Sequence, residues 1–211
     1  SMFIHGDTLL VTGKPKKRIV RTYHNVKIFK SDLQGKCDSI HTNQTTGYTK
    51  MYRNPVIWSD QNQITGDSIY LQSNTETENL DSLKVFNNAF IISKDSLSKD
   101  DFNQIKGRNM YGKFLENKLK TLFVEGNAEY LKASEGKTYP PSMFPDEDRK
   151  LKNFIWREDE QPKKMEDIFI VDKNDGKKPP LKKKSSKNSS AVIQDKKLKE
   201  KKKVSTLQDN E

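Results

Sequence analysis

A short pattern recurs along the first 131 residues, and it constrains the fold more than any other feature of the chain. Each copy joins an Asn- or Pro-containing turn to an apolar segment, and then to a second β-rich segment, which in most copies contains Asp. The Asn/Pro position falls at residues 25, 55, 88 and 127, and the Asp position at residues 7, 38 and 67. Spacings that vary around a constant unit indicate equivalent strands joined by loops of variable length.

Each copy predicts two short strands with a turn between them. Apolar side chains stand two residues apart after each turn, and residues two apart on a strand point to the same face. These pairs are Val26/Ile28, Val56/Trp58, Ala89/Ile91 and Ala128/Tyr130. Pro55 has no N–H to donate to a ladder, so we expect it at the start of a strand or on an edge.

The composition limits how thick a core these strands can form. Only 32% of the 211 residues are hydrophobic, against roughly 45–50% in ordinary soluble domains. Repeats of this length with little apolar content favour an all-β, stacked and elongated structure with a narrow apolar interior. Its open edges would permit assembly by strand addition, and its interior would be a slot for an elongated apolar ligand.

The repeated unit resembles the OstA-like lipopolysaccharide-transport proteins. Residues 51–58, 62–70 and 102–110, with 151–156 and 162–169 after them, are especially similar to Bacteroidetes members of that family. The resemblance implies a β-jellyroll, or folded β-taco, that holds lipopolysaccharide acyl chains between its sheets in the periplasm. It also implies head-to-tail stacking, contacts with other lipopolysaccharide-transport proteins through sheet edges, no catalysis and no cofactor.

The resemblance assigns the lining of the slot by position. The implied residues are the four apolar pairs and three candidates from the second strands: Val26, Ile28, Val56, Trp58, Ala89, Ile91, Ala128, Tyr130, Ile4, Ile64 and Ile105. Basic residues at the mouth of the slot could meet lipid phosphates. The candidates are Lys27, Lys30, Arg53 and Lys106, for which an ordinary solvated strand face is the alternative.

The chain divides into three predicted regions. Residues 1–135 form the OstA-like β-jellyroll, and residues 136–171 an extended linker with an apolar capping or docking segment around Leu151, Phe154, Ile155 and Trp156. Residues 172–211 carry 13 lysines, 6 acids and no aromatic residue, a composition typical of a disordered tail. Such a tail serves solubility or meets phosphate-bearing partners; without aromatic residues, sequence-specific nucleic-acid binding has little support, and no nucleic-acid partner is predicted.

Other classes of site lack the residues they need. A single cysteine, Cys37, excludes an internal disulfide and a cysteine-based zinc site. The three histidines share no metal-ligand spacing, and the recurring Asp residues are best explained as structural repeat positions, so neither a metal site nor an enzyme is predicted. The mean hydropathy of −0.95 and the lack of a long apolar run exclude a membrane-spanning helix. The chain starts without a secretory signal, and Ser1-Met2 is typical of an expression remnant, so the periplasm remains the expected location.

Three functions remain open from the sequence. The first is a periplasmic protein that carries or bridges lipopolysaccharide between the inner and outer membranes. The second is a structural or assembly protein of the cell envelope whose β edges bind other proteins without carrying lipid. The third is nucleic-acid binding through the lysine-rich tail, which would depend steeply on salt.

Overall fold

A computed structural model describes residues 2–95, 101–116, 118–132 and 150–170. These residues form twelve strands of one sheet and two short 3₁₀ helices, which confirms the all-β prediction. None of the described helices is long and apolar enough to cross a membrane. The predicted disordered tail, residues 172–211, lies outside the described residues.

The strands and 3₁₀ helices have the following bounds, in chain order: β1 Phe3–His5, β2 Thr8–Thr12, β3 Ile19–Lys30, β4 Leu33–Asn43, β5 Tyr48–Tyr52, β6 Val56–Ser59, β7 Asn62–Thr65, β8 Ser68–Ser73, β9 Leu80–Lys94, β10 Phe102–Leu115, β11 Lys118–Glu125, β12 Glu129–Leu131, η2 Glu158–Glu160 and η3 Met165–Phe169.

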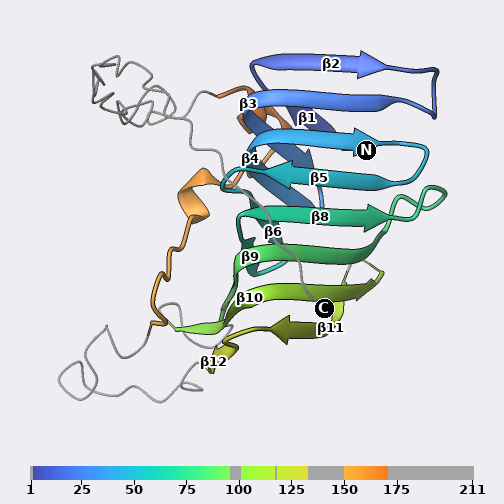
Figure 1. The fold of residues 1–211 in the computed structure, drawn as a ribbon. Coiled ribbons are helices and arrows are strands. Elements are labelled where there is room, and N and C mark those ends of the chain that lie inside the picture. Colours follow the sequence, from blue (N-terminus) through green and yellow to red (C-terminus); the bar gives the residue numbers. More distant parts are fainter. Residues whose placement is uncertain (1, 96–100, 117, 133–149, 171–211) are drawn as a thin grey trace, which may run out of the picture. The chain divides into compact units, whose positions relative to one another are not determined.

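The sheet is folded into two layers along a line that crosses its strands. The front layer runs in the order β2-β3-β4-β5-β8-β9-β10-β11, and Figure 1 shows these strands one below another. The back layer runs in the order β1-β3-β4-β6-β7-β9-β10-β12. The long strands β3, β4, β9 and β10 belong to both layers, because each contributes one half to either side of the fold line. All the pairings are antiparallel, as the repeated strand pairs predicted.

The fold line is made by residues with a left-handed backbone. Pairs of such residues stand at four places along the chain, with φ between 50° and 75°: His24–Asn25, Arg53–Asn54, Asn87–Asn88 and Gly126–Asn127. Asn and Gly tolerate this conformation better than other residues do. In β3 and β9 the pair stands opposite a single residue of the neighbouring strand, which is a β-bulge and bends the strand. The recurring Asn of the sequence is therefore a hinge position.

In the second copy the hinge residue is Asn54, so the sequence alignment that put Pro55 in this place was one residue out. Pro55 follows the hinge and precedes β6 directly, at the strand start that its missing N–H predicted.

Two glycines let the two layers approach each other at the fold line: Gly66, between β7 and β8, and Gly107, in β10. A Cβ atom added to Gly66 would lie 2.3 Å from Val85 Cγ1, and one added to Gly107 would lie 2.4 Å from Val124 Cγ1. The recurring Asp residues come next and bind the hinge side chains. Asn25 donates to Asp7 and Asn88 to Asp67, both at 3.0 Å. The repeated Asp thus has a structural partner in each of these copies.

Candidate binding site between the two sheets

A row of eight residues in register crosses the inner face of the back layer. Each residue is the cross-strand partner of the next: Ile4, Ile28, Gly35, Ile57, Ile64, Ile91, Ile105 and Tyr130. Cross-strand partners share a face of the sheet. The back layer therefore presents a nearly unbroken aliphatic stripe to the space between the layers.

Two rows of the front layer face this stripe. The first contains Leu9, Thr22, Ile40, Met51, Ile69, Val85, Met110 and Val124. The second contains Val11, Val20, Thr42, Thr49, Leu71, Leu83, Gly112 and Leu122. The buried apolar side chains of the three rows form one hydrophobic cluster, and Thr22, Thr42 and Thr49 are buried beside it.

The middle of this interior is filled by the protein's own side chains. Ile28, Met51, Ile69 and Val85 are each 0–1% exposed. The same rows become exposed at the two ends of the sheet, where Leu9 is 56%, Val11 45% and Tyr130 63% exposed. The apolar interior is thus closed in its centre and accessible from both end strands.

Most of the predicted lining residues meet in this interior. Six of them share the single inner row of the back layer: Ile4, Ile28, Ile64, Ile91, Ile105 and Tyr130. Val26 and Ala89 also belong to the buried cluster, directly after their hinges. Ala128 is exposed and lies just before β12, outside the strand.

Val56 and Trp58 do not share a face with the other lining residues, and the prediction that they do was wrong. Both are buried, but they pair with Lys36 and Gln34 and lie on the outer face of the back layer. The cause is the alignment of Pro55 with the hinge residue: the hinge is Asn54, so Ile57 is the equivalent of Ile28, three residues after its hinge. A shift of one residue turns every side chain of a strand to the opposite face.

Ile57 takes the inner position in place of Val56 and Trp58, and the sequence reasoning missed it. It also missed the front-layer rows, whose signal is the alternation of Thr49 and Met51 with the polar and aromatic residues of β5.

A hydrogen bond joins the two layers at the mouth of the folded sheet, opposite the fold line. Lys30, at the end of β3 in the back layer, donates a hydrogen bond from Nζ to the carbonyl of Glu78 at 3.2 Å. Glu78 lies in the loop between β8 and β9, in the front layer. Leu33 and Leu80, at the adjoining strand ends, are 8% and 7% exposed. Opening of the interior therefore requires this contact to break.

Of the four basic residues predicted at the mouth, only Lys30 lies there. Lys27 is buried and donates to the carbonyl of Ile170 at 2.6 Å, on the outer side of the back layer. Lys106 pairs with Glu129 at 2.8 Å, and Arg53 at the fold line binds Asp38 at 3.1 Å.

A hollow of about 630 Å³ lies outside the fold line. It is lined by polar and charged side chains such as His24 and Asp38, which are 3.1 Å apart. In the part of the chain that the structure describes, no group of three or more His, Cys, Asp or Glu residues is placed to hold a metal ion. Tyr23 and Tyr52 also line this hollow, and none of its lining residues belongs to the three inner rows.

Residues 150–170, here called the strap, cross the outer face of the back layer. A row of three buried or nearly buried glutamines receives it: Gln104 accepts from the Leu151 amide, Gln63 binds both Ile155 and Arg157, and Gln34 accepts from Gln161. Phe102 contacts the rings of Phe154 and Trp156 at about 5 Å between centroids. The predicted apolar segment around Leu151 to Trp156 therefore covers a face of the sheet, whereas an end cap would cover its edge.

Two comparisons with known proteins found similarities to this chain. Residues 1–77 match the family described as "LptA/(LptD N-terminal domain) LPS transport protein". A search among curated proteins found no match. Among solved structures, the crystal structure of LptH, "the LptA homologous periplasmic component of the conserved lipopolysaccharide transport device from Pseudomonas aeruginosa", is similar with a TM-score of 0.47 and 6% identity. The similarity covers 62% of this chain and 94% of LptH.

Proposed function

We propose that this protein is an OstA-like periplasmic carrier of lipopolysaccharide between the inner and outer membranes, and the family match of residues 1–77 supports this proposal. The acyl chains bind between the front and back layers, and the sugar part remains in water. The chain's own residues supply an apolar enclosure and no chemical step.

The observation that carries the proposal is the apolar interior that continues from one end strand to the other. Isoleucines follow one another across β1, β3, β6, β7, β9 and β10 in a single register, and the row is interrupted only by Gly35. An acyl chain in water costs on the order of 0.8 kcal/mol for each exposed CH₂ group. A continuous row of similar side chains offers similar binding positions along its length, which favours movement over trapping.

The end strands support head-to-tail assembly of several copies. Each layer contains eight strand positions in antiparallel alternation, so its first and last strands run in opposite directions and can pair antiparallel between copies. If the rows continue across the junction, Ile4 of one copy meets Tyr130 of the next, and Leu9 meets Val124. Leu9, Leu10 and Val11 are 45–56% exposed in β2. Assembly would therefore cover apolar surface and join the interiors.

A structural or assembly protein without lipid carriage is the second candidate, and the filled centre of the interior favours it. Met51, Ile69 and Val85 already pack inside the sheet with no exposed surface. In that case the interior is an ordinary core, and only the edges of the sheet have partners. The two functions differ in whether acyl chains enter the interior.

A matched pair of variants in β2 tests the proposal. Leu9 and Leu10 are adjacent and similarly exposed, but Leu9 lies on the inner row and Leu10 on the outer row. We expect Leu9→Asp to weaken lipopolysaccharide binding about tenfold or more in a titration monitored by native mass spectrometry, because it places a charge where acyl chains enter. Leu10→Asp is expected to bind like the wild type. Equal affinities for both variants would contradict lipid entry at this end, and no binding by the folded wild type would favour the structural function.

A further inference from the structure

The outer face of the front layer carries a chain of aromatic rings. Tyr48 and Tyr52 each meet Tyr70 edge to face at 5.9 Å between centroids, and Tyr70 meets Phe86 at 5.0 Å. The chain continues through Tyr111 to Phe123, at 6.4 Å and 6.1 Å. The rings therefore extend across β5, β8, β9, β10 and β11, on the side of the sheet opposite the apolar interior.

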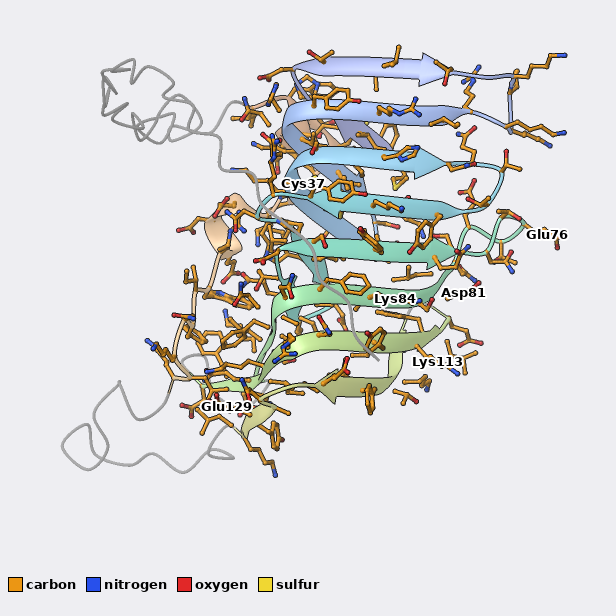
Figure 2. All side chains as sticks on the ribbon, in the orientation of Figure 1. Cys37, Glu76, Asp81, Lys84, Lys113 and Glu129 are labelled. Atoms are coloured by element: carbon orange, nitrogen blue, oxygen red, sulfur yellow. The ribbon has the colours of Figure 1, made fainter. Side chains whose placement is uncertain are left out.

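Four cations stand among these rings. Arg21, Lys50, Lys84 and Lys113 lie in the outer rows of β3, β5, β9 and β10, and Figure 2 labels Lys84 and Lys113 on neighbouring strands. Lys50 Nζ lies 5.1 Å from the centre of the Tyr70 ring and 5.4 Å from that of Tyr48. Rings and cations thus alternate on one surface.

The positive charge of this surface is not balanced by acids. Three cross-strand rows make up this outer face, and they run from Thr8 to Glu125, from Leu10 to Phe123 and from Thr12 to Thr121. Among the described residues, no ion pair joins an acid to any of these four cations, and Glu125 is the single acid in the three rows. Arg21, His41 and Lys50 are direct cross-strand neighbours. The pKa of His41 is lowered by its desolvation and then by Arg21 and Lys50. The lowered pKa favours the neutral form of His41, so the charge of this region is carried by Arg21 and Lys50, which a bound polyanion would neutralise.

We propose that the outer face of the front layer, over β3, β5 and β8 to β11, is a second binding surface that takes the phosphorylated saccharide part of lipopolysaccharide. This inference rests on the proposed function for the identity of the glycolipid, but it concerns the face opposite the acyl-chain site. Phosphates pair with the lysines and Arg21, and the apolar faces of the sugar rings lie on the tyrosines.

The geometry of the rings favours a saccharide over a membrane. Tyr48, Tyr70, Phe86 and Tyr111 are half-buried against one another, so they form a platform level with the sheet and do not project into a bilayer. Tyrosine combines an apolar ring with a hydroxyl group that can bond a sugar hydroxyl. The cations at intervals along the platform suit a ligand with several separated negative charges.

The test uses the phosphorylated oligosaccharide obtained by complete deacylation of lipopolysaccharide, with the same oligosaccharide after dephosphorylation as the second probe. Binding to the full chain is measured by calorimetry, and the contacted amides are located by NMR. The variant Lys50→Gln/Lys84→Gln/Lys113→Gln removes three cations from the surface. The control Lys14→Gln/Lys16→Gln/Lys17→Gln removes three exposed cations from the turn between β2 and β3.

We expect the surface variant to bind the phosphorylated oligosaccharide at least about tenfold more weakly than the wild type, because hydrogen bonds to charged groups are lost. The control is expected to stay within about twofold, and dephosphorylation should weaken binding to the wild type. The proposal is overturned if both triple variants lose affinity equally, if neither does, or if anionic vesicles bind this face and the oligosaccharide does not. Because the probe has no acyl chain, failure of the proposed acyl-chain site leaves this measurement unaffected.

Discussion

At the scale of single residues, the left-handed hinge positions decide where the sheet folds. Asn88 has φ of 50° and donates to Asp67 at 3.0 Å. A left-handed backbone costs a residue with a Cβ roughly 1–2 kcal/mol, whereas Gly adopts it freely. The side-chain hydrogen bond and the backbone preference can therefore be separated by two substitutions at the same position.

We predict that Asn88→Ala lowers the free energy of unfolding by about 1–2 kcal/mol, because it loses both the hydrogen bond and the tolerance of positive φ. Asn88→Gly keeps the backbone preference and should lose less. Urea unfolding followed by tryptophan fluorescence measures both. An alanine variant at least as stable as the glycine variant would show that the hinge does not depend on positive φ.

A second prediction at this scale concerns Glu160 in the strap. Arg157 binds both of its carboxylate oxygens, at 2.7 and 2.8 Å, and with Lys36 at 3.0 Å it lowers the pKa of Glu160 to about 2. The unfolded carboxyl has a pKa of about 4.3. Because the folded value is the lower one, the stabilisation is present above about pH 4.3 and is lost as the pH falls toward 2.

Glu160→Gln is therefore expected to make stability depend less on pH between about 4.3 and 2. Urea midpoints across this range measure the difference from the wild type. Glu76→Gln, in the exposed loop between β8 and β9, is the control and should follow the wild type. If the Glu160 variant has an unchanged pH profile, the ion pair does not stabilise the strap.

At the scale of elements, the strap depends on a glutamine that the sheet buries completely. Gln63 donates to the Ile155 carbonyl at 2.7 Å and accepts from the Arg157 amide at 2.6 Å. Leucine of similar size leaves both backbone groups without these partners, at a cost of about 1–3 kcal/mol for each buried group. The loss falls on the strap, because the rest of β7 keeps its ladder bonds.

We predict that Gln63→Leu releases the strap while the two layers remain folded. Hydrogen exchange should then accelerate in residues 151–161 and stay slow in β3 to β9. Gln72→Leu, which removes hydrogen bonds to the carbonyls of Thr46 and Ser73 on the front layer, is the matched control and should leave the strap protected. Unchanged exchange in the strap of the Gln63 variant would contradict the role of this glutamine.

The elements also show which parts of the fold the repeated sequence pattern predicts. The repeat of hinge, apolar pair and Asp predicted the strand pairs and most of the inner row, because each position has a local physical cause. It failed at Val56 and Trp58, because it aligned Pro55 with the hinge residue, which is Asn54, and so placed β6 one residue out of register. The place of the strap could not be predicted, because glutamines on a strand give no signal of a partner about 50 to 130 residues away.

At the scale of the whole molecule, we predict a defined register between stacked copies. If the outer row of the front layer continues across the junction, Leu10 of one copy lies opposite Phe123 of the next. A mixture of Leu10→Cys and Phe123→Cys chains should therefore form a disulfide-linked pair on mild oxidation. Cys37 should not compete, because burial and then Asp38 raise the pKa of its thiol to about 12.

The control mixture combines Leu10→Cys with Thr121→Cys, which lies two residues along β11. Non-reducing electrophoresis at low protein concentration compares the two yields. Equal yields would indicate random collision, and a higher yield in the control would indicate a different register between copies.

Entry of acyl chains between the layers can be tested with a photo-crosslinking amino acid placed at Leu9 or at Leu10. The two positions are neighbours in the exposed end strand β2 and differ in the layer face to which they point. We predict a lipopolysaccharide adduct at position 9 and little or none at position 10, after irradiation of the folded protein with lipopolysaccharide. Adducts of equal yield at both positions, or an adduct at position 10 alone, would contradict an interior binding site.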